Sequence, residues 1–374
     1  MKGKASVVGA GTMGHGIAQI LATSGYEVYL YDLTDEILKN ALDRIRQSLE
    51  KFQSKGIVKD VEEIMLRIKP TTSLEEALRG SAIVIEAAPE EINLKKEIFK
   101  KAEALSPEAE LLATNTSSLP ITEISEGLSK REKVIGLHFF NPPQLMRLVE
   151  VVKGSYTSDK AVNRAVELAK ELNKTPVLVM KDVPGFIVNR LLARLMNASC
   201  QLVERGRAEI LQIDSAVKHK LGFPMGVFEL ADYSGVDVFY LVFKAMKERG
   251  FVATLCRSFE EKYLEKKFGV KSGEGFYRYP GKGIYKKPEI PKEAGEPFDP
   301  WLVVAPEIAE AYWIINNNVA SEEDVNVSSK LGLGYPKGIM EYEKEIGKEG
   351  VRRYLQQLKE ITGLDEYDYL LKFL

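Results

Sequence analysis

Cysteine and histidine are both scarce in this sequence of 374 residues. The two cysteines, Cys200 and Cys256, form no CxxC motif and have no metal-ligand spacing. Neither a disulfide framework nor a metal site is therefore predicted, and a reducing compartment fits this composition. Only three histidines are present, which leaves few candidates for acid-base catalysis near neutral pH.

Long apolar runs and an excess of one charge are missing as well. No apolar run reaches 18 residues, and the first predicted strand begins almost at Met1, without the charged and apolar regions of a signal peptide. The 52 basic and 54 acidic residues give a net charge of -2, which provides no general attraction to nucleic acid or anionic lipid. We therefore expect a cytoplasmic protein that binds neither nucleic acid nor membranes.

The remaining composition is that of an ordinary globular enzyme, with 45% hydrophobic and 28% charged residues. In the first half of the chain, short β-branched runs alternate with helical patterns, which predicts a doubly wound, largely parallel sheet. The predicted strands are a run from Lys4 that ends at the glycines, Glu27 to Tyr31, Ala82 to Glu86, Leu111 to Asn115, Val134 to Phe139, Leu148 to Val152 and Val177 to Met180. We expect an α/β Rossmann-type domain over residues 1–182, with a helical insert at about 35–69.

From Pro184 onward, long helical patterns replace this alternation and predict an all-α C-terminal domain. The boundary falls near residues 181–185, where Asp182 is expected to cap a helix whose first turn carries Pro184. Residues 221–226 (LGFPMG) match residues 333–338 (LGYPKG) at an offset of 112, and the match extends over neighbouring positions without gaps. The helical domain is therefore predicted to consist of two repeated units, 183–290 and 291–374, with a proline-rich linker between them.

A glycine-rich segment, GAGTMG, follows the first predicted strand and opens a helix. In this context, backbone amides and the helix dipole can hold a pyrophosphate, so we expect a dinucleotide contact at Gly9, Gly11, Thr12, Met13 and Gly14. Asp32 lies 18 residues beyond Gly14, where its carboxylate can accept hydrogen bonds from ribose hydroxyls and would repel a 2′-phosphate. NAD is therefore favoured over NADP; the alternative role for Asp32 is a helix cap.

His138 is the strongest candidate for a general base. It lies near the end of a predicted strand, and the carboxyl ends of strands face the ligand crevice in a doubly wound fold. His15 and His219 are interpreted as solvated or packing residues. Glu150 interrupts an apolar strand, where a buried carboxylate needs a partner, and an imidazole would supply one. An outward-facing surface position is the alternative for Glu150.

Several segments together make the sequence resemble the 3-hydroxyacyl-CoA dehydrogenase family over essentially its whole length. These segments are VGAGTMG (8–14), IEAAPE (85–90), NTSS (115–118), GLHFFNP (136–142), LVEV (148–151) and VPGFIVNR (183–190). The resemblance implies oxidation of an (S)-3-hydroxyacyl-CoA with NAD, in fatty acid β-oxidation, by His138 as general base and Glu150 as its partner. It also implies that Ser117 donates a hydrogen bond to the substrate oxygen and His138, and that Asn189 orients the acyl group or the histidine.

Further residues match family positions with binding roles. Glu90 and Lys95 match positions near the nicotinamide and its ribose. The insert looks like the helical hairpin that grips coenzyme A, with Ser48 and Lys55 at contact positions, and a lysine cluster suits phosphates. The alternatives are a helix cap for Ser117, simple exposure for Asn189, and a solvated helix face for the hairpin.

The chain departs from the family's simpler members by carrying two helical units. In the second unit, Trp301 stands where the repeat would place the counterpart of Asn189, so that unit is expected to be structural. We expect it to occupy the surface used by a partner subunit, which favours a monomer over a homodimer. Duplicated units also occur in members fused to an enoyl-CoA hydratase, so the chain could belong to a longer protein. A dehydrogenase of free 3-hydroxy or sugar acids and a dinucleotide-binding sensory or structural protein remain the alternatives.

Overall fold

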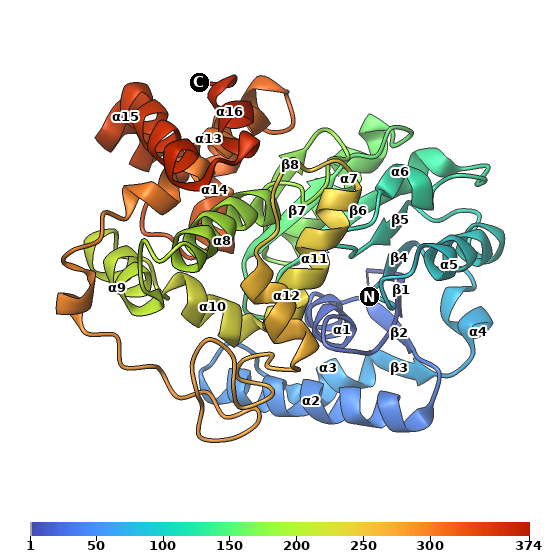
Figure 1. Cartoon of the computed structure of the whole chain (residues 1–374). Coiled ribbons are helices and arrows are strands. Elements are labelled where there is room, and N and C mark those ends of the chain that lie inside the picture. The colour runs from blue at the N-terminus through green and yellow to red at the C-terminus, as the bar shows by residue number, and fades with distance from the viewer. Residues whose placement is uncertain (1) are drawn as a thin grey trace. The chain divides into compact units, whose positions relative to one another are not determined.

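The computed structural model describes residues 2–374. The chain forms two compact units, Met1–Val183 and Pro184–Leu374, and each is described by itself (Figure 1). Unit 1 contains an eight-stranded sheet in the order β3-β2-β1-β4-β5-β6-β7-β8. Its strands are β1 (Lys4–Val8), β2 (Glu27–Tyr31), β3 (Ile68–Thr71), β4 (Ile83–Glu86), β5 (Leu111–Thr114), β6 (Val134–Phe139), β7 (Leu148–Val152) and β8 (Thr175–Val179).

All neighbouring strands run parallel except β6 and β7, which pair antiparallel. The predicted Rossmann-type, largely parallel sheet is therefore confirmed. Helices cover both faces, as the buried runs of β4, β6 and β7 require. The helices of this unit are α1 (Gly14–Thr23), α2 (Asp35–Ser54), α3 (Val61–Leu66), α4 (Leu74–Leu78), α5 (Ile92–Leu105), α6 (Ile121–Ile124) and α7 (Asp159–Glu171), with a 3₁₀ turn at Arg131–Lys133.

One apolar core joins α1, α2, α3 and α7 to one face of the sheet. Alternate strand residues supply that face, because side chains of a strand point to opposite sides in turn. The contributing strand residues include Ala5, Val7, Val28, Leu30, Ile83, Ile85, Ile135, Leu137, Val149 and Val151. The core fixes the carboxyl ends of β1, β4 and β5 in a row, and the candidate site is built there.

The helical insert consists of α2 and α3, and β3 follows it directly. Thr34 and Asp60 cap these two helices through their side chains, which accept the amides of Ile37 and Glu63. No strand was predicted at β3, whereas the helical insert, expected at about 35–69, ends with α3 at Leu66. Pro70 in β3 argues against a strand by pattern alone, but β3 lies at the edge of the sheet, where a missing amide donor is tolerated.

Unit 2 is helical, as expected. Its helices are α8 (Val188–Glu204), α9 (Ile210–Lys220), α10 (Val227–Ser234), α11 (Val236–Glu248), α12 (Arg257–Leu264), α13 (Trp301–Asn316), α14 (Glu322–Gly332), α15 (Ile339–Thr362) and α16 (Asp365–Leu371), with a 3₁₀ turn at Lys292–Gly295. The expected capping role of Asp182 is wrong. The α8 helix begins at Val188 without a side-chain cap, and the Asp182 carboxylate instead accepts the Thr122 amide at 2.8 Å.

The offset of 112 residues relates helices as well as sequence. It carries α9 onto α14 and the start of α10 onto the start of α15, while α8 and α13 end at equivalent residues. We call α8–α10 the first copy and α13–α15 the second copy. In each copy a glutamate three residues into the helix accepts the amide of the glycine before the helix: Glu229 accepts the Gly226 amide at 3.0 Å, and Glu341 accepts the Gly338 amide at 2.9 Å. The LGFPMG and LGYPKG turns thus end one helix and begin the next in both copies.

The two turns face one another. The rings of Phe223 and Tyr335, which are equivalent residues, stack with centroids 3.8 Å apart. A Cβ added to Gly222 would meet Pro336 at 3.3 Å, and one added to Gly334 would meet Pro224 at 3.1 Å. Each turn therefore contacts its own equivalent, as the two halves of a twofold-symmetric interface do.

The expectation of no disulfide is contradicted. Cys200 in α8 and Cys256 before α12 form a disulfide, with their Cα atoms 6.1 Å apart. Fifty-six residues separate them in sequence, so the spacing carried no signal for the pairing. The cysteine content consequently gives no support to the predicted reducing compartment.

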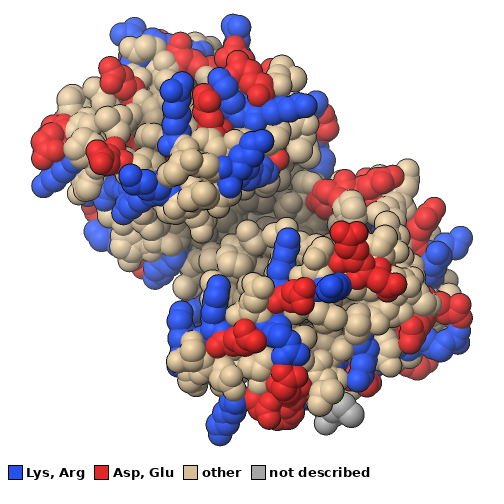
Figure 2. All heavy atoms as spheres, turned by 90° about the horizontal axis from the view of Figure 1, so that it is seen from below, with Lys and Arg blue, Asp and Glu red and all other residues tan. Residues whose placement is uncertain are grey.

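Two observations concern the surface. Among the helices of residues 2–374, none combines the length and the apolar character that a membrane span needs. Figure 2 shows Lys and Arg side chains interspersed with Asp and Glu side chains on the face in view, in keeping with the net charge of -2.

Candidate active site and cofactor site

The glycine segment forms a tight turn between β1 and α1. Gly9 has a φ of 104°, and a Cβ there would meet the Ala87 carbonyl oxygen at 2.5 Å. A Cβ on Gly14 would meet the Gly9 oxygen at 1.7 Å, so both positions require glycine. A Cβ on Gly11 would have no neighbour within 4 Å. The turn is therefore compact towards the protein and open on the other side, as close approach of a pyrophosphate requires. Thr12 and Met13 complete this turn before the first residue of α1.

Asp32 follows β2 directly and is tied to the glycine turn. Its Oδ2 accepts the Ala10 amide at 2.7 Å and its Oδ1 accepts the Leu33 amide at 2.7 Å. The helix that follows is capped by Thr34, so the alternative role of Asp32 as that cap is wrong. The half-buried carboxylate beside the turn fits a contact with ribose hydroxyls.

His138 and Glu150 lie directly opposite one another in the antiparallel pair of β6 and β7. Residues paired in this way point to the same side of the sheet, and the His138 Nδ1 lies 2.6 Å from Glu150 Oε2. The histidine is 6% exposed and the glutamate 0%, so the surface alternative for Glu150 is wrong. The contact with the carboxylate fixes the orientation of the His138 ring.

The other two histidines lie in different surroundings. His15 Nδ1 lies 2.7 Å from the Gly11 carbonyl oxygen, and burial lowers the pKa of His15 below its usual value, which keeps the ring neutral at pH 7. His219 Nε2 lies 3.1 Å from the Ile290 carbonyl oxygen in unit 2. Neither ring is paired with a carboxylate, which separates both from His138.

Ser117 lies in the loop that leaves β5, and Glu90 holds this loop. The Glu90 Oε1 accepts the backbone amides of Ser117 at 3.1 Å and of Ser118 at 3.0 Å, together with the hydroxyls of Ser118 and Thr116. The α6 helix is capped by neither serine, because its N-cap is Pro120. The helix-cap alternative for Ser117 is therefore wrong.

Lys95 lies between two carboxylates. Its Nζ is 2.6 Å from Glu86 Oε1 and 3.2 Å from Glu90 Oε2, and its side chain is 1% exposed. Burial raises the pKa of Glu86 above its usual range, although Lys95, Thr114 and the Ala88 amide all lower it. For Glu90, burial is outweighed by Lys95 and by the Thr116 and Ser118 hydroxyls, so its pKa lies below its usual range. Glu90 is partly exposed, at 36%, and is therefore the member of this cluster that a ligand can reach.

The remaining predicted site residues lie on the helical hairpin and at the start of α8. Ser48 is within α2 and Lys55 is its C-cap, so the two are seven residues apart and share one face of the hairpin. Lys55 is exposed and Ser48 is half-buried. Asn189 is half-buried in the first turn of α8, in unit 2.

Sequence reasoning missed the residues that support the site from behind. The Asn115 Oδ1 accepts the Phe139 amide at 2.9 Å, which fixes the end of β6 beside His138. Glu86 and Thr114 are both fully buried and bonded to each other at 2.6 Å. Asn115 and Glu86 fall inside segments that resemble the family, but only neighbouring strands in the sheet reveal their partners.

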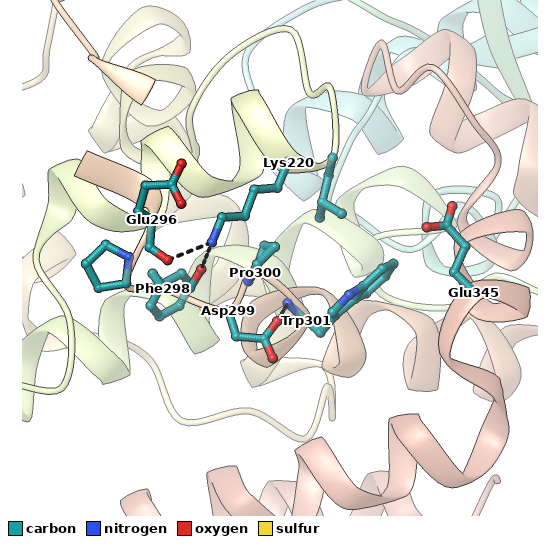
Figure 3. Close-up of a pocket in the computed structure, with 9 residues that line it drawn as sticks. Lys220, Glu296, Phe298, Asp299, Pro300, Trp301 and Glu345 are labelled. Carbon is teal, nitrogen blue, oxygen red and sulfur yellow. Dashed lines mark hydrogen bonds between the residues drawn. The ribbon is translucent and has the colours of Figure 1, made fainter. Parts of the chain in front are cut away.

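A cavity of about 380 Å³ is lined by residues of unit 2 alone (Figure 3). Trp301, the counterpart of Asn189, lines it together with prolines of the linker. Figure 3 shows the Lys220 ammonium bonded to the backbone carbonyls of Glu296 and Phe298, at 3.0 Å and 2.9 Å. Lys220 therefore closes the linker against α9.

The sequence matches two families of domains. Residues 4–183 match the 3-hydroxyacyl-CoA dehydrogenase NAD-binding domain, and residues 185–279 match the C-terminal domain of the same enzyme. The chain is 39% identical over 284 residues to the mitochondrial hydroxyacyl-coenzyme A dehydrogenase of Sus scrofa, which covers 73% of this chain and 90% of the relative.

Solved structures agree with the sequence comparison. The 3-hydroxybutyryl-CoA dehydrogenase of Escherichia coli K12 superposes with a TM-score of 0.87 at 28% identity, over 98% of this chain and 96% of that chain. The (S)-3-hydroxybutyryl-CoA dehydrogenase of Ralstonia eutropha has a TM-score of 0.70 at 34% identity, over 74% of this chain and 98% of that one. The dehydrogenase part of multifunctional enzyme 1 from Caenorhabditis elegans has a TM-score of 0.64 at 25% identity, over 99% of this chain and 89% of that chain.

Proposed function

Because the chain belongs to the 3-hydroxyacyl-CoA dehydrogenase family, we propose that it oxidises the 3-hydroxyl group of an (S)-3-hydroxyacyl-CoA to a ketone and also catalyses the reverse reaction. The protein is an oxidoreductase and its cofactor is NAD. The observation that carries the proposed chemistry is the buried contact of 2.6 Å between His138 Nδ1 and Glu150 Oε2. The (S) configuration is named for the relative from Ralstonia eutropha.

His138 removes the hydroxyl proton during oxidation. Glu150 holds the proton of Nδ1, so the unprotonated Nε2 receives the proton from the substrate. The carboxylate also stabilises the imidazolium that results, because it lies in a buried environment where charge interactions are strong. When held at the glycine turn, NAD would supply the hydride acceptor for oxidation, and NADH would supply the hydride for the reverse reaction.

Ser117 and Asn189 are proposed to contact the substrate. Ser117 lies in a loop whose amides are already held by Glu90, so its hydroxyl can be aimed at the oxygen that changes between alcohol and ketone. Asn189, at the start of α8, is proposed to orient the acyl group or the histidine. Neither side chain serves as a helix cap, which supports a role towards a ligand.

The glycine turn, Asp32, Glu90 and Lys95 are proposed to hold NAD. Amides of the turn and of the first turn of α1 would meet the pyrophosphate, and Asp32 would accept the ribose hydroxyls. Glu90 is the partly exposed member of its cluster, which suits a contact near the nicotinamide ribose. Coenzyme A is proposed to lie on the hairpin face that carries Ser48 and Lys55.

We propose the domain division 1–182, 183–290 and 291–374, with the second copy as a structural duplicate of the first. The stacking of Phe223 on Tyr335 supports a monomer, because the second copy already covers the turn that a partner subunit would contact. A homodimer and a hydratase domain in a longer parent chain stay predictions, as does the cytoplasmic location.

The proposed function is tested with His138→Ala. The variant should bind NADH normally, as measured by fluorescence titration, while its turnover of acetoacetyl-CoA falls about 10²-fold or more, the usual contribution of a general acid-base group. His219→Ala is the matched control and should keep the turnover of the wild type, since its ring bonds only a backbone carbonyl in unit 2. Retained turnover in His138→Ala would contradict the assignment, and faster reduction of free 3-oxo acids than of acetoacetyl-CoA by the wild type would favour the free-acid alternative.

A further inference from the structure

We propose that Glu86 is a positioning residue of the proposed dehydrogenase reaction, acting through Lys95 and Glu90 on the loop that carries Ser117. The inference rests on the proposed function, because the loop matters only if Ser117 contacts the reacting substrate. Glu86 is fully buried and contacts Lys95, one of the residues expected to touch a ligand.

The Glu86 carboxylate is fixed by three donors. Its Oε1 accepts the Lys95 ammonium at 2.6 Å and the Ala88 amide at 2.6 Å, while its Oε2 accepts the Thr114 hydroxyl at 2.6 Å. The donors come from the start of α5, the turn after β4 and the end of β5. A carboxylate bonded from three elements has one orientation available, so it can act as a reference point for the site.

Lys95 transmits this orientation to Glu90. The ammonium is 1% exposed and bridges Glu86 Oε1 to Glu90 Oε2, with a further bond to the Ala88 carbonyl oxygen at 3.3 Å. Because Lys95 holds the Oε2 of Glu90, the other oxygen of that carboxylate is turned towards the loop. Without Glu86, the ammonium would have Glu90 as its only charged partner in this cluster and would be drawn towards it.

Glu90 then organises the loop. Its Oε1 receives the amides of Ser117 and Ser118 and the hydroxyls of Ser118 and Thr116, so four donors converge on one oxygen. The loop between β5 and α6 has no helix or strand of its own to set its conformation. Displacement of that oxygen by Lys95 would therefore move the Ser117 backbone directly, and reactive groups misplaced by about 1 Å can lose 10²-fold in rate.

The test compares Glu86→Gln with Glu86→Asp and with Glu91→Gln. Glu86→Gln removes the charge beside Lys95 and keeps the shape of the side chain. The kcat of this variant for acetoacetyl-CoA reduction should fall about 10- to 100-fold, while its KM for acetoacetyl-CoA changes little. Glu86→Asp keeps the charge and should recover part of that loss. Glu91→Gln changes an exposed carboxylate in the same segment and should leave both constants unchanged.

A purely structural role would predict a different pattern. Loss of folded protein lowers the apparent kcat of all substrates in proportion to the unfolded fraction, so melting temperatures are measured alongside and rates are taken where every variant is folded. If Glu86→Gln does not fold, Thr114→Val removes one hydroxyl from the same carboxylate and should lower kcat about threefold, with KM unchanged.

The outcomes separate this inference from the proposed function. If the wild type is active and the Glu86→Gln variant, or Thr114→Val in its place, keeps the wild-type kcat, the positioning role alone is overturned. A wild type that does not reduce acetoacetyl-CoA overturns the proposed function, and the positioning role falls with it. A selective loss of kcat in folded Glu86→Gln, partly recovered in Glu86→Asp, supports both.

Discussion

In the first helical copy, Asp214 accepts hydrogen bonds from the amides of Phe228 and Glu229 and from the Tyr277 hydroxyl. In the second copy, the equivalent Asn326 accepts the Met340 amide at 2.9 Å. The two side chains occupy the same place, because a Cβ on Gly226 would meet Asp214 and a Cβ on Gly338 would meet Asn326 in the same way. The two copies therefore share the backbone conformation of this turn, but the side chain that accepts the helix amides is a carboxyl group in Asp214 and a neutral amide in Asn326.

The ion pairs of the two copies differ in burial. Lys218 and Glu229 are 8% and 0% exposed, whereas the equivalent Lys330 and Glu341 are 39% and 41% exposed. The first copy is covered by the segment that contains Tyr277 and Tyr285, whose hydroxyls bond Asp214 and Glu229. A duplicated unit thus keeps the hydrogen bonds that form its own turns, while the environment that it receives from the rest of the chain decides how much each charge matters.

The largest expected effect concerns an ion cluster that exists on one side only. The Glu310 carboxylate of α13 forms ion pairs with the guanidinium groups of Arg190, at 2.6 Å, and Arg194, at 2.7 Å. All three side chains are at most 3% exposed. The offset of 112 carries these positions onto apolar or small residues, since Glu310 corresponds to Ala198 and the two arginines to Leu302 and Pro306. The packing of the two copies is therefore asymmetric in charge.

Glu310→Ala should lower the free energy of unfolding by about 3 to 5 kcal/mol, because it leaves two buried guanidinium groups without their carboxylate. Urea denaturation measures the change. Glu261→Ala removes an exposed partner of Arg257 and should cost less than about 0.5 kcal/mol. Equal, small losses in both variants would show that the cluster adds nothing to the association of α8 with α13.

The second prediction uses the acid and the amide at equivalent positions. Burial raises the pKa of Asp214 to about 7. The folded state therefore binds more protons than the unfolded state between about pH 4 and pH 7, and stability falls as the pH rises through this window. The contribution of this one group is on the order of 4 kcal/mol.

Asp214→Asn should remove that loss, so its unfolding free energy relative to the wild type should rise from pH 4 to pH 7. Asn326→Asp introduces a carboxyl group at a half-buried position, where desolvation is smaller, so it should change the pH dependence of stability less than Asp214→Asn does. Thermal unfolding at a series of pH values measures both. Parallel pH profiles of the wild type and Asp214→Asn would contradict the buried titration of Asp214.

The smallest effect in free energy compares Asn189 with Trp301. Asn189→Ala should lower kcat about 10²-fold, equivalent to about 3 kcal/mol, if its amide contacts the substrate or His138. Trp301→Ala changes the cavity of Figure 3 and should keep kcat within about twofold of the wild type. Steady-state reduction of acetoacetyl-CoA measures both, and equal losses would give the second copy a part in catalysis.

Several features followed from local patterns. The β-branched runs and the glycine turn predicted the sheet and the dinucleotide site, and the matching turns at 221–226 and 333–338 predicted the duplication. Other features could not be predicted from the neighbouring residues in the sequence. The strand β3 was not predicted because it contains Pro70. Proline is tolerated in an edge strand, and only the sheet order shows that β3 lies at an edge. The disulfide was missed, because only packing brings Cys200 and Cys256 together.

The sequence by itself determined the periodicity of the strands and helices, the glycines that the turn at residue 9 requires, and the candidate identity of His138 and Glu150. Only the tertiary structure decided that these two residues lie opposite one another in an antiparallel pair, and that Lys95 lies between Glu86 and Glu90. The physical reason is that backbone preferences and hydrophobic spacing act over a few residues, whereas the partner of a buried charge is set by strand order and register.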